Sequence, residues 1–227
     1  MIENVGKIIW LTGASGLVGS RLLDALLQVP EFRVIAVTRR PLGRESLRLA
    51  NRIVPFAQLE QQLKGQSCDT ALCCLGTSYK EAGSEAAYRE AAQVHVLAFA
   101  RAARAAGARR FVMLSCQSAN CASRRPAARV LGETLEALIA LNFESLDLLL
   151  PGPLLGMRRG AGLSQLLAML AALALRPLQN GARQSHRAVG ASLVAAAMLG
   201  AARSGRRGIY RYDYSGIRAL SRMRGRT

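Results

Sequence analysis

Three glycines near the start of the chain have the spacing of a phosphate-binding turn. Gly13, Gly16 and Gly19 follow a short apolar run and begin a helical pattern. At the start of a helix, unpaired backbone N–H groups and the positive end of the helix dipole attract a pyrophosphate. Gly13 would make the tight turn, Gly16 would let the phosphates approach the backbone, and Gly19 would let the helix pack against the strand. The pattern predicts a dinucleotide site formed by Thr12, Gly13, Ser15, Gly16, Leu17, Val18 and Gly19.

The end of the next β-branched run distinguishes between two dinucleotides. An acidic residue at this position would bind the ribose 2′-hydroxyl of NAD(H). This chain instead carries Arg39 and Arg40 after Thr38, and guanidinium groups suit a 2′-phosphate in charge and in bidentate geometry. We therefore expect NADP(H) to be favoured. NAD(H) is the alternative, and in that case both arginines would simply face solvent.

Short apolar runs alternate with helical patterns along most of the chain. Strands are predicted at 7–12, 33–38, 52–54, 69–75, 110–115 and 145–150, and helices at 17–27, 84–106 and 127–141, with shorter helices before and after the strand at 52–54. This alternation predicts an α/β fold with a Rossmann-like, doubly wound parallel sheet. On that fold, the end of strand 69–75 and the residues after it lie near the adenine ribose or the diphosphate, so we add Leu75, Gly76 and Thr77 to the cofactor-binding residues.

The pattern loosens after Pro151. Helices are predicted at 163–175 and 188–202, a strand at 208–212 and a last helix at 215–222. This part is too small for a core of its own. We therefore interpret the chain as a single domain, with a Rossmann core at 1–156 and a small C-terminal substrate-side cap and basic tail at 157–227. The two long apolar stretches are too short to cross a bilayer, and they are candidates for a homodimer interface.

The charge of the chain is strongly basic. Its 227 residues include 31 Lys and Arg against 14 Asp and Glu, a formal net charge of +17. Such a balance attracts polyanions, but the arginines are spread along the sequence, which favours solvated faces over a site for nucleic acid or an anionic membrane. A nucleic-acid-associated protein is kept as an alternative, because Tyr210, Arg211, Tyr212 and Tyr214 could stack on bases.

The cysteines and the first residues bear on location. The five cysteines are odd in number and form no CxxC pair, so neither a disulfide framework nor a metal site is predicted. Reduced thiols and the lack of a secretory pattern lead us to expect a cytoplasmic protein.

Five segments resemble the short-chain dehydrogenase/reductase superfamily in its extended and atypical branches. They are TGASGLVG (12–19), VTRR (37–40), CCLGTSYKEAGSE (73–85), RFVMLS (110–115) and PGPLLG (151–156). The third segment is particularly similar to the atypical group of Tat-interacting-protein-type oxidoreductases and their bacterial relatives. The resemblance covers about residues 7–156. It implies a Rossmann fold and NAD(P) binding, and it adds Ser115, Pro151 and Gly152 to the expected cofactor-binding residues.

The chain departs from this superfamily in its proton donor. The resemblance implies a serine at the end of the fifth strand, which Ser115 either matches or misses by one place, and a Tyr-x-x-x-Lys pair on the next helix. The expected tyrosine falls on Ala127 and the expected lysine on Leu131, and an Asp or Asn of the preceding helix falls on Ala92. Reduction of a carbonyl needs a proton at the developing alkoxide, and neither alanine nor leucine can supply one. We therefore expect an NADP(H)-binding protein with weak or no classical reductase activity, acting as a cofactor sensor or scaffold.

The alternative is an active NADP-dependent oxidoreductase that uses a non-standard donor on an unidentified small-molecule substrate. The catalytic candidates are Ser115, acting with water, and Cys116. Nearby arginines are poor donors because a guanidinium stays charged; they are Arg124, Arg125 and Arg129. His95 lies within an apolar helix and is interpreted as structural, whereas His186 either caps a helix or faces the cleft. Tyr88 is the one tyrosine between residues 80 and 209.

Overall fold

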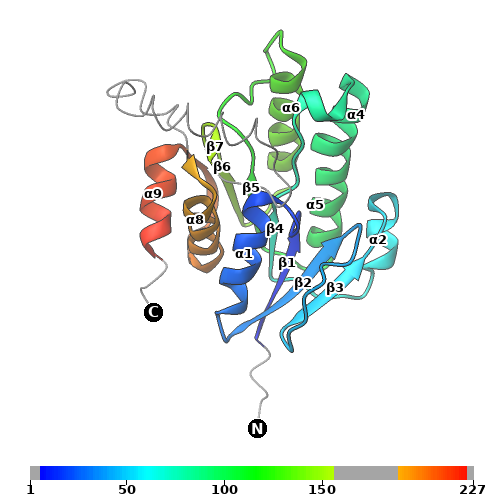
Figure 1. Ribbon diagram of the computed structural model, residues 1–227, viewed down its shortest axis with the longest axis vertical. Helices are drawn as coiled ribbons and strands as arrows, with labels where there is room; N and C mark the ends of the chain where they lie inside the picture. The colour runs from blue at the N-terminus through cyan, green and yellow to red at the C-terminus, as the bar shows by residue number, and fades with distance from the viewer. Residues whose placement is uncertain (1–5, 156–188, 224–227) are drawn as a thin grey trace.

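Seven parallel strands form one sheet at the centre of the computed structural model, which describes residues 6–155 and 189–223 (Figure 1). From edge to edge the order is β3-β2-β1-β4-β5-β6-β9. The bounds are β1 (Lys7–Thr12), β2 (Phe32–Thr38), β3 (Leu49–Ile53), β4 (Thr70–Cys73), β5 (Arg110–Leu114), β6 (Ser145–Leu149) and β9 (Gly208–Tyr212). The order reverses between β1 and β4, which is the point where doubly wound sheets bind ligands.

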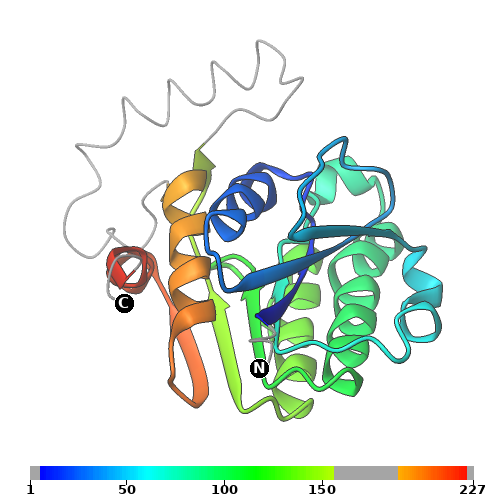
Figure 2. The ribbon, with the colours of Figure 1, turned by 90° about the horizontal axis from the view of Figure 1, so that it is seen from below.

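Helices cover both faces of the sheet, as the view from below shows (Figure 2). One face carries α1 (Leu17–Leu27) and α8 (Ala191–Arg203), with α9 (Tyr214–Arg222) packed against α8. The other face carries α2 (Leu59–Gln62), α5 (His95–Ala105) and α6 (Pro126–Ala140). The remaining short elements are the 3-10 turn η1 (Phe56–Gln58), α3 (Tyr79–Ala82), α4 (Glu85–Arg89) and the small strand pair β7 (Leu154–Leu155) and β8 (Val189–Gly190). The predicted doubly wound α/β fold is confirmed.

The central strands are apolar on both sides because both faces of the sheet are covered. In β1, Ile9 and Leu11 point into the core beneath α1 and α8, whereas Trp10 points into the core beneath α5. This alternation is the two-residue period of a strand. The Trp10 indole N–H keeps a partner despite its burial, since it donates to the Ser67 carbonyl at 3.0 Å.

Some element boundaries differ from the expectation. The short helix predicted before the third strand does not form among residues 39–48, and β3 begins at Leu49 because it pairs with β2 there. The long helix predicted at 84–106 contains a π-helical turn, η2 (Glu90–Val94), between α4 and α5. The helix predicted at 163–175 and His186 lie outside the described residues.

The C-terminal segment 189–223 belongs to the main sheet rather than to a cap. β9 pairs with β6 from Ser145↔Gly208 to Leu149↔Tyr212, and α8 packs against α1. A buried polar network fastens this edge. The Arg110 guanidinium lies 2.7 Å from Asp147 Oδ2, and the Tyr212 hydroxyl donates to Asp147 Oδ1 at 2.8 Å. Long-range pairing of this kind leaves no local signal in the sequence.

Candidate functional site

The loop from β1 to α1 lies at the carboxyl end of β1, where the strand order of the sheet reverses. Gly13 has φ +75°, and a β-carbon there would lie 2.4 Å from the Cys74 carbonyl oxygen. A β-carbon at Gly19 would lie 2.1 Å from the Gly13 carbonyl oxygen. Both positions therefore need glycine, one for its backbone conformation and both for close approach. The sequence pattern assigned these two roles correctly.

The first turn of α1 is open to an anion. Its N-cap residue, Gly16, provides no side-chain cap, and the turn holds no acidic residue. Among the described residues, the backbone N–H groups of Leu17 and Val18 have no acceptor. Such uncapped amides at a helix N-terminus favour a phosphate group.

Two cavities meet at this turn, and Gly16 and Leu17 line both. The first, called here the α1 cavity, has a volume of about 540 Å³ and is lined by Ala14, Ser15, Gly16, Leu17, Ser20, Arg21, Leu23, Asp24, Pro41, Leu42 and Arg44. The second, called here the Ser115 cavity, has a volume of about 440 Å³; its lining includes Val18, Leu75, Gly76, Thr77, Tyr88, Ser115, Cys116 and Leu131. An extended ligand crossing the glycine turn could reach both cavities.

The Ser115 cavity presents an unsatisfied hydroxyl. Ser115 follows β5, and its backbone N–H donates to the Leu149 carbonyl at 3.0 Å. Its Oγ is buried and has no hydrogen-bond partner, and the same holds for Gln117 Oε1. Buried polar atoms are nearly always paired, so an orphaned hydroxyl in a cavity indicates a position for a ligand atom. Together with the glycine turn, it makes the site fit a dinucleotide whose reactive end points toward Ser115.

Two cysteines, Cys74 and Cys116, line the Ser115 cavity. Cys116 lines the Ser115 cavity, and its Sγ lies 2.9 Å from Ser118 Oγ. Cys73 is the last residue of β4 and Cys74 follows it. Burial raises the pKa of the Cys73 thiol to about 12 and that of the Cys74 thiol well above its ordinary value. These two thiols therefore stay protonated and behave as small apolar side chains.

Several predicted residues lie outside both cavities. The Thr12 hydroxyl, expected as a donor to the cofactor, is buried and donates to the Val37 carbonyl at 3.1 Å, so it belongs to the sheet. Pro151 is buried, and its carbonyl accepts the Gln117 N–H at 3.2 Å. Gly152 follows it and also lines neither cavity. Through this hydrogen bond, Pro151 supports the loop that follows Ser115.

The arginines near the site fall into two groups. Arg39 and Arg40 are exposed after β2, line neither cavity, and form no ion pair among the described residues. Arg21 and Arg44 line the α1 cavity and were not predicted. Arg21 donates to the Leu17 carbonyl at 2.6 Å, and Arg44 pairs with Asp24. Arg21 lies one helical turn after Leu17, which is the signal that could have found it.

Tyr88 is the other residue that sequence reasoning did not assign to the site. It lies on α4, is only 4% exposed, and lines the Ser115 cavity. Burial raises its pKa, and charge on the nearby Cys116 sulfur raises it further. No sequence signal could place it there, because α4 and the end of β5 are brought together only by the fold.

His95 lines neither cavity and packs as a structural residue. Its ring stacks on Phe56 with centroids 4.6 Å apart. Burial lowers its pKa, Glu90 opposes that shift, and Arg39 adds to it. This arrangement agrees with the structural interpretation of His95.

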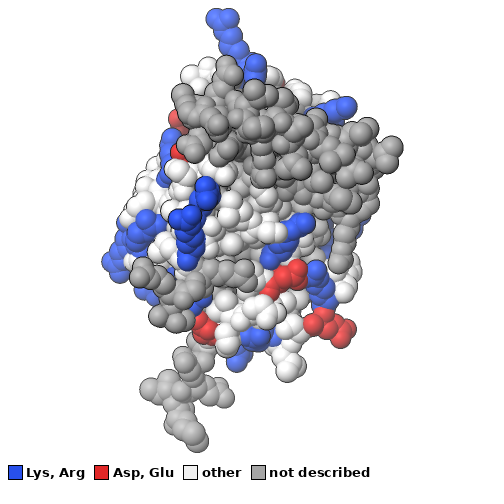
Figure 3. Space-filling model, turned by 60° about the vertical axis from the view of Figure 1, so that its left-hand side comes forward, with Lys and Arg blue, Asp and Glu red and all other residues white. Residues whose placement is uncertain are grey.

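Basic side chains do not merge into one patch on the face shown in Figure 3, where they form separate groups with uncharged atoms between them. Two of the three tyrosines expected to stack on bases already have partners: Tyr212 is buried and donates to Asp147, and Tyr210 donates to the Arg207 carbonyl while Arg206 lies 4.6 Å above its ring. Nucleic-acid binding therefore stays an alternative prediction, supported by the net charge of +17. Within residues 6–155 and 189–223, no helix is long and apolar enough to span a bilayer, and no cluster of ligating side chains suits a metal ion.

Curated proteins are similar in sequence to about two thirds of this chain. Protein HTATIP2 of Rattus norvegicus is 32% identical over 154 residues, which are 66% of this chain and 63% of that protein, so the chain spans less than two thirds of this relative. The mitochondrial protein fmp52 of Aspergillus fumigatus is 33% identical over 160 residues, 66% of this chain and 67% of that protein. FMP52 of Kluyveromyces lactis, also named as mitochondrial, is 34% identical over 154 residues, 65% and 67% of the two chains.

Solved structures share the fold at low identity. A UDP-N-acetylglucosamine 4-epimerase from Methanobrevibacter ruminantium has a TM-score of 0.69 and 14% identity, covering 92% of this chain and 76% of that one. WbmH of Bordetella bronchiseptica, solved with NAD⁺, has a TM-score of 0.69 and 16% identity, covering 95% and 79%. The sequence profile of the NAD(P)H-binding family matches residues 13–142. The chain therefore belongs to the NAD(P)H-binding family, and it is an atypical short-chain dehydrogenase/reductase with a Rossmann fold.

Proposed function

We propose that this protein binds NADP(H) in preference to NAD(H) and has weak or no reductase activity of the Tyr-Lys kind, acting as a cofactor sensor or scaffold. The observation that carries the proposal is the uncapped start of α1, which opens onto both cavities at Gly16 and Leu17. The diphosphate is held by the amides of the first helical turn, and the nicotinamide half lies toward Ser115.

The 2′-phosphate preference rests on the residues after β2. The residues there are Thr38, Arg39 and Arg40, so none of them offers a carboxylate to a ribose 2′-hydroxyl. Thr38 is buried and its hydroxyl donates to the Arg40 carbonyl. Arg39 and Arg40 are exposed and carry no ion pair among the described residues. Each can therefore turn toward a phosphate without breaking an existing contact.

The expectation of weak reductase activity rests on two residues of α6. Ala127 and Leu131 occupy the positions expected to carry the tyrosine and the lysine, and Leu131 lines the Ser115 cavity. The bound cofactor would supply hydride chemistry, but α6 offers no group that can hold or move a proton at those positions. Turnover with carbonyl compounds is therefore slow compared with a reductase that carries the pair.

Calorimetric titration with NADPH, NADH, NADP⁺ and NAD⁺ tests this function. We expect the wild type to bind NADPH at least about tenfold more tightly than NADH, since charge-assisted hydrogen bonds contribute about 1.5–3 kcal/mol each. The double variant Arg39→Ala/Arg40→Ala should lose that preference while keeping its affinity for NADH.

A matched control removes the same charge at the opposite end of the sheet. Arg33 is the second residue of β2 and pairs with Ile8, and Arg109 precedes β5. Both are exposed, and Arg33→Ala/Arg109→Ala should keep the NADPH preference. Equal affinity of the wild type for NADPH and NADH would refute the 2′-phosphate assignment, and failure to bind either would refute the function.

A further inference from the structure

The space beside Ala127 is occupied by a residue from another helix. Tyr88, Ala92 and Val130 form a small buried cluster, and Ala127 and Leu131 pack against it. Ala127 and Leu131 are the positions at which a tyrosine and a lysine are expected. The phenol of Tyr88, on α4, therefore lies in the same cluster as Ala127, the α6 position at which a tyrosine is expected.

Tyr88 is placed to act on a ligand in the Ser115 cavity. Its side chain lines that cavity together with Ser115 and Cys116. Its hydroxyl makes no hydrogen bond to any described residue, and neither does Ser115 Oγ. Two hydroxyl groups without partners thus line one cavity of about 440 Å³. Such a pair suits an oxygen atom that accepts two hydrogen bonds, as a carbonyl oxygen does.

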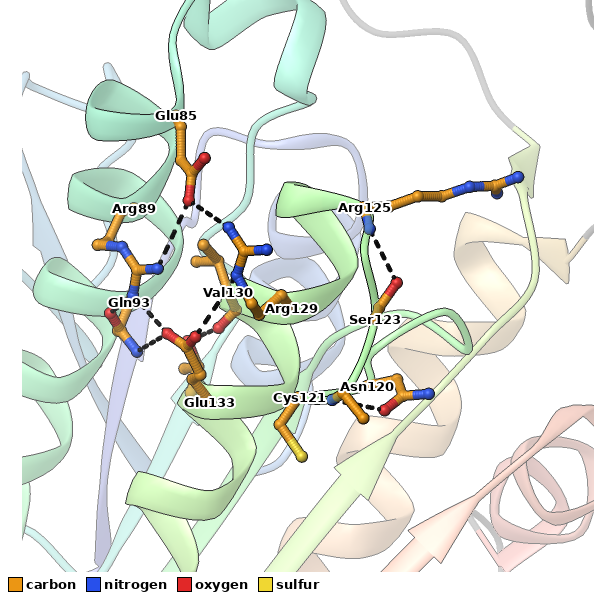
Figure 4. A network of polar contacts seen from close by, with 12 residues as sticks. Glu85, Arg89, Gln93, Asn120, Cys121, Ser123, Arg125, Arg129, Val130 and Glu133 are labelled. Atoms are coloured by element: carbon orange, nitrogen blue, oxygen red, sulfur yellow. Dashed lines mark hydrogen bonds and ion pairs between the residues drawn. The ribbon is translucent and has the colours of Figure 1, made fainter.

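The helix that carries Tyr88 is clamped to α6 by charged side chains (Figure 4). Arg89 pairs with Glu133 of α6, and Arg129 of α6 lies 2.8 Å from Glu85. Glu85 and Arg89 lie on either side of Tyr88 along α4, so both flanks of its turn are tied to α6. This clamp fixes the phenol relative to the α6 face.

We propose that Tyr88 supplies, from α4, the proton-donating hydroxyl that α6 lacks, and that Tyr88 and Ser115 together hold the oxygen of a small carbonyl compound. This inference rests on the proposed function, because the reduced dinucleotide supplies the two electrons and the hydrogen that the carbonyl carbon receives. The carbonyl oxygen takes the proton of Tyr88 Oη, which gives the alcohol. Tyr88 then regains a proton from water.

The surroundings of Tyr88 suit a donor better than a base. Burial holds its pKa above the ordinary value, with Cys116 adding to the shift. The other titratable groups near it are Glu81, which lines the cavity, and Tyr79, whose ring lies 5.5 Å from that of Tyr88. The α6 residues of the cluster do not titrate. Among the residues that the structure describes, no cationic side chain contributes to the pKa of Tyr88. Tyr88 therefore gives up its proton slowly, which agrees with weak activity.

Binding of benzaldehyde to the NADP⁺ complex tests this role without turnover. Tyr88→Phe keeps the ring and removes the hydroxyl, so we expect an unchanged unfolding temperature and NADP⁺ affinity but about tenfold weaker benzaldehyde binding. With NADPH, the rate of benzaldehyde reduction should fall by about a hundredfold, the usual scale for losing a general acid. Tyr79→Phe is the matched control, since Tyr79 does not line the cavity, and it should change neither quantity.

A second measurement uses the wild-type protein alone. With tyrosines labelled for NMR, benzaldehyde added to the NADP⁺ complex should shift the Tyr88 ring resonance and leave that of Tyr79 in place. The inference is overturned if Tyr88→Phe binds and reduces benzaldehyde like the wild type, or if the wild type shows neither binding nor reduction. NADP(H) binding by the same samples keeps the proposed function intact in either case, whereas its loss would point to the function itself.

Discussion

The Gly13 carbonyl oxygen lies against Gly19 so closely that a β-carbon at Gly19 would stand 2.1 Å from it. Gly19→Ala should therefore push the start of α1 away from β1. We expect a loss of about 1–3 kcal/mol in unfolding free energy and at least tenfold weaker NADPH binding, because the first-turn amides move with the helix. Denaturant unfolding and calorimetry measure the two effects.

Gly205→Ala is the matched control for this change. No heavy atom lies within 4 Å of a β-carbon at Gly205, so stability and NADPH affinity should stay close to those of the wild type. Wild-type affinity in Gly19→Ala would show that the close approach of α1 to the turn is not needed for binding.

Ser115→Ala should separate stability from binding. The Ser115 Oγ is buried without a partner, and an unsatisfied buried hydroxyl costs about 1–3 kcal/mol. Its removal should leave the unfolding free energy unchanged or higher while weakening the binding of benzaldehyde to the NADP⁺ complex. By contrast, Ser145→Ala removes a buried hydroxyl that contacts Arg110 at 2.6 Å and Asp147 at 3.0 Å, and should lower stability. A drop in stability for Ser115→Ala comparable to that of Ser145→Ala would contradict this assignment.

Asp147→Asn should strongly destabilise the edge of the sheet formed by β5, β6 and β9. Asp147 is fully buried and accepts from both Arg110 and Tyr212. Removing its charge leaves the Arg110 guanidinium buried without compensation, which costs about 3–5 kcal/mol. Chemical unfolding measures the loss.

Glu144→Gln removes an exposed carboxylate from the same region as a control. Glu144 lies 3.5 Å from Arg207 at the surface, and such substitutions change stability by about 0.5 kcal/mol or less. A similar small effect of Asp147→Asn would mean that the buried network does not hold β9 in place.

The clamp between α4 and α6 should weaken in acid. The Arg89 guanidinium beside Glu133 holds the pKa of that carboxyl below its ordinary value. A depressed pKa means that the contribution is complete above the ordinary glutamate range and is lost as the pH falls through the folded-state pKa. The pair is partly exposed, so its contribution stays below about 1 kcal/mol and falls with salt.

Unfolding temperatures of the wild type and Glu133→Gln measure this effect across pH. The wild type should be the more stable at neutral pH, and the two curves should converge as Glu133 becomes protonated. Glu45→Gln is the control, since Glu45 is exposed and forms no ion pair among the described residues. A gap that persists in strong acid would assign the effect of Glu133→Gln to packing instead of charge.

The sequence alone was enough to predict the doubly wound sheet and the glycine turn. Both depend on local rules: side chains alternate along a strand, and Gly13 and Gly19 stand at the spacing that a tight strand-to-helix turn requires. The lack of the tyrosine and lysine stays a prediction: counted without gaps along the chain, the expected positions fall on Ala127 and Leu131.

Only the tertiary structure decided which groups share the site. The Thr12 hydroxyl donates to the Val37 carbonyl within the sheet, Arg44 lines the α1 cavity, and Tyr88 lines the Ser115 cavity. β9 joined β6 although more than fifty residues separate them in the chain. These outcomes depend on the packing of helices and strands that are distant in sequence, and neither residue spacing nor apolar periodicity carries information about such contacts.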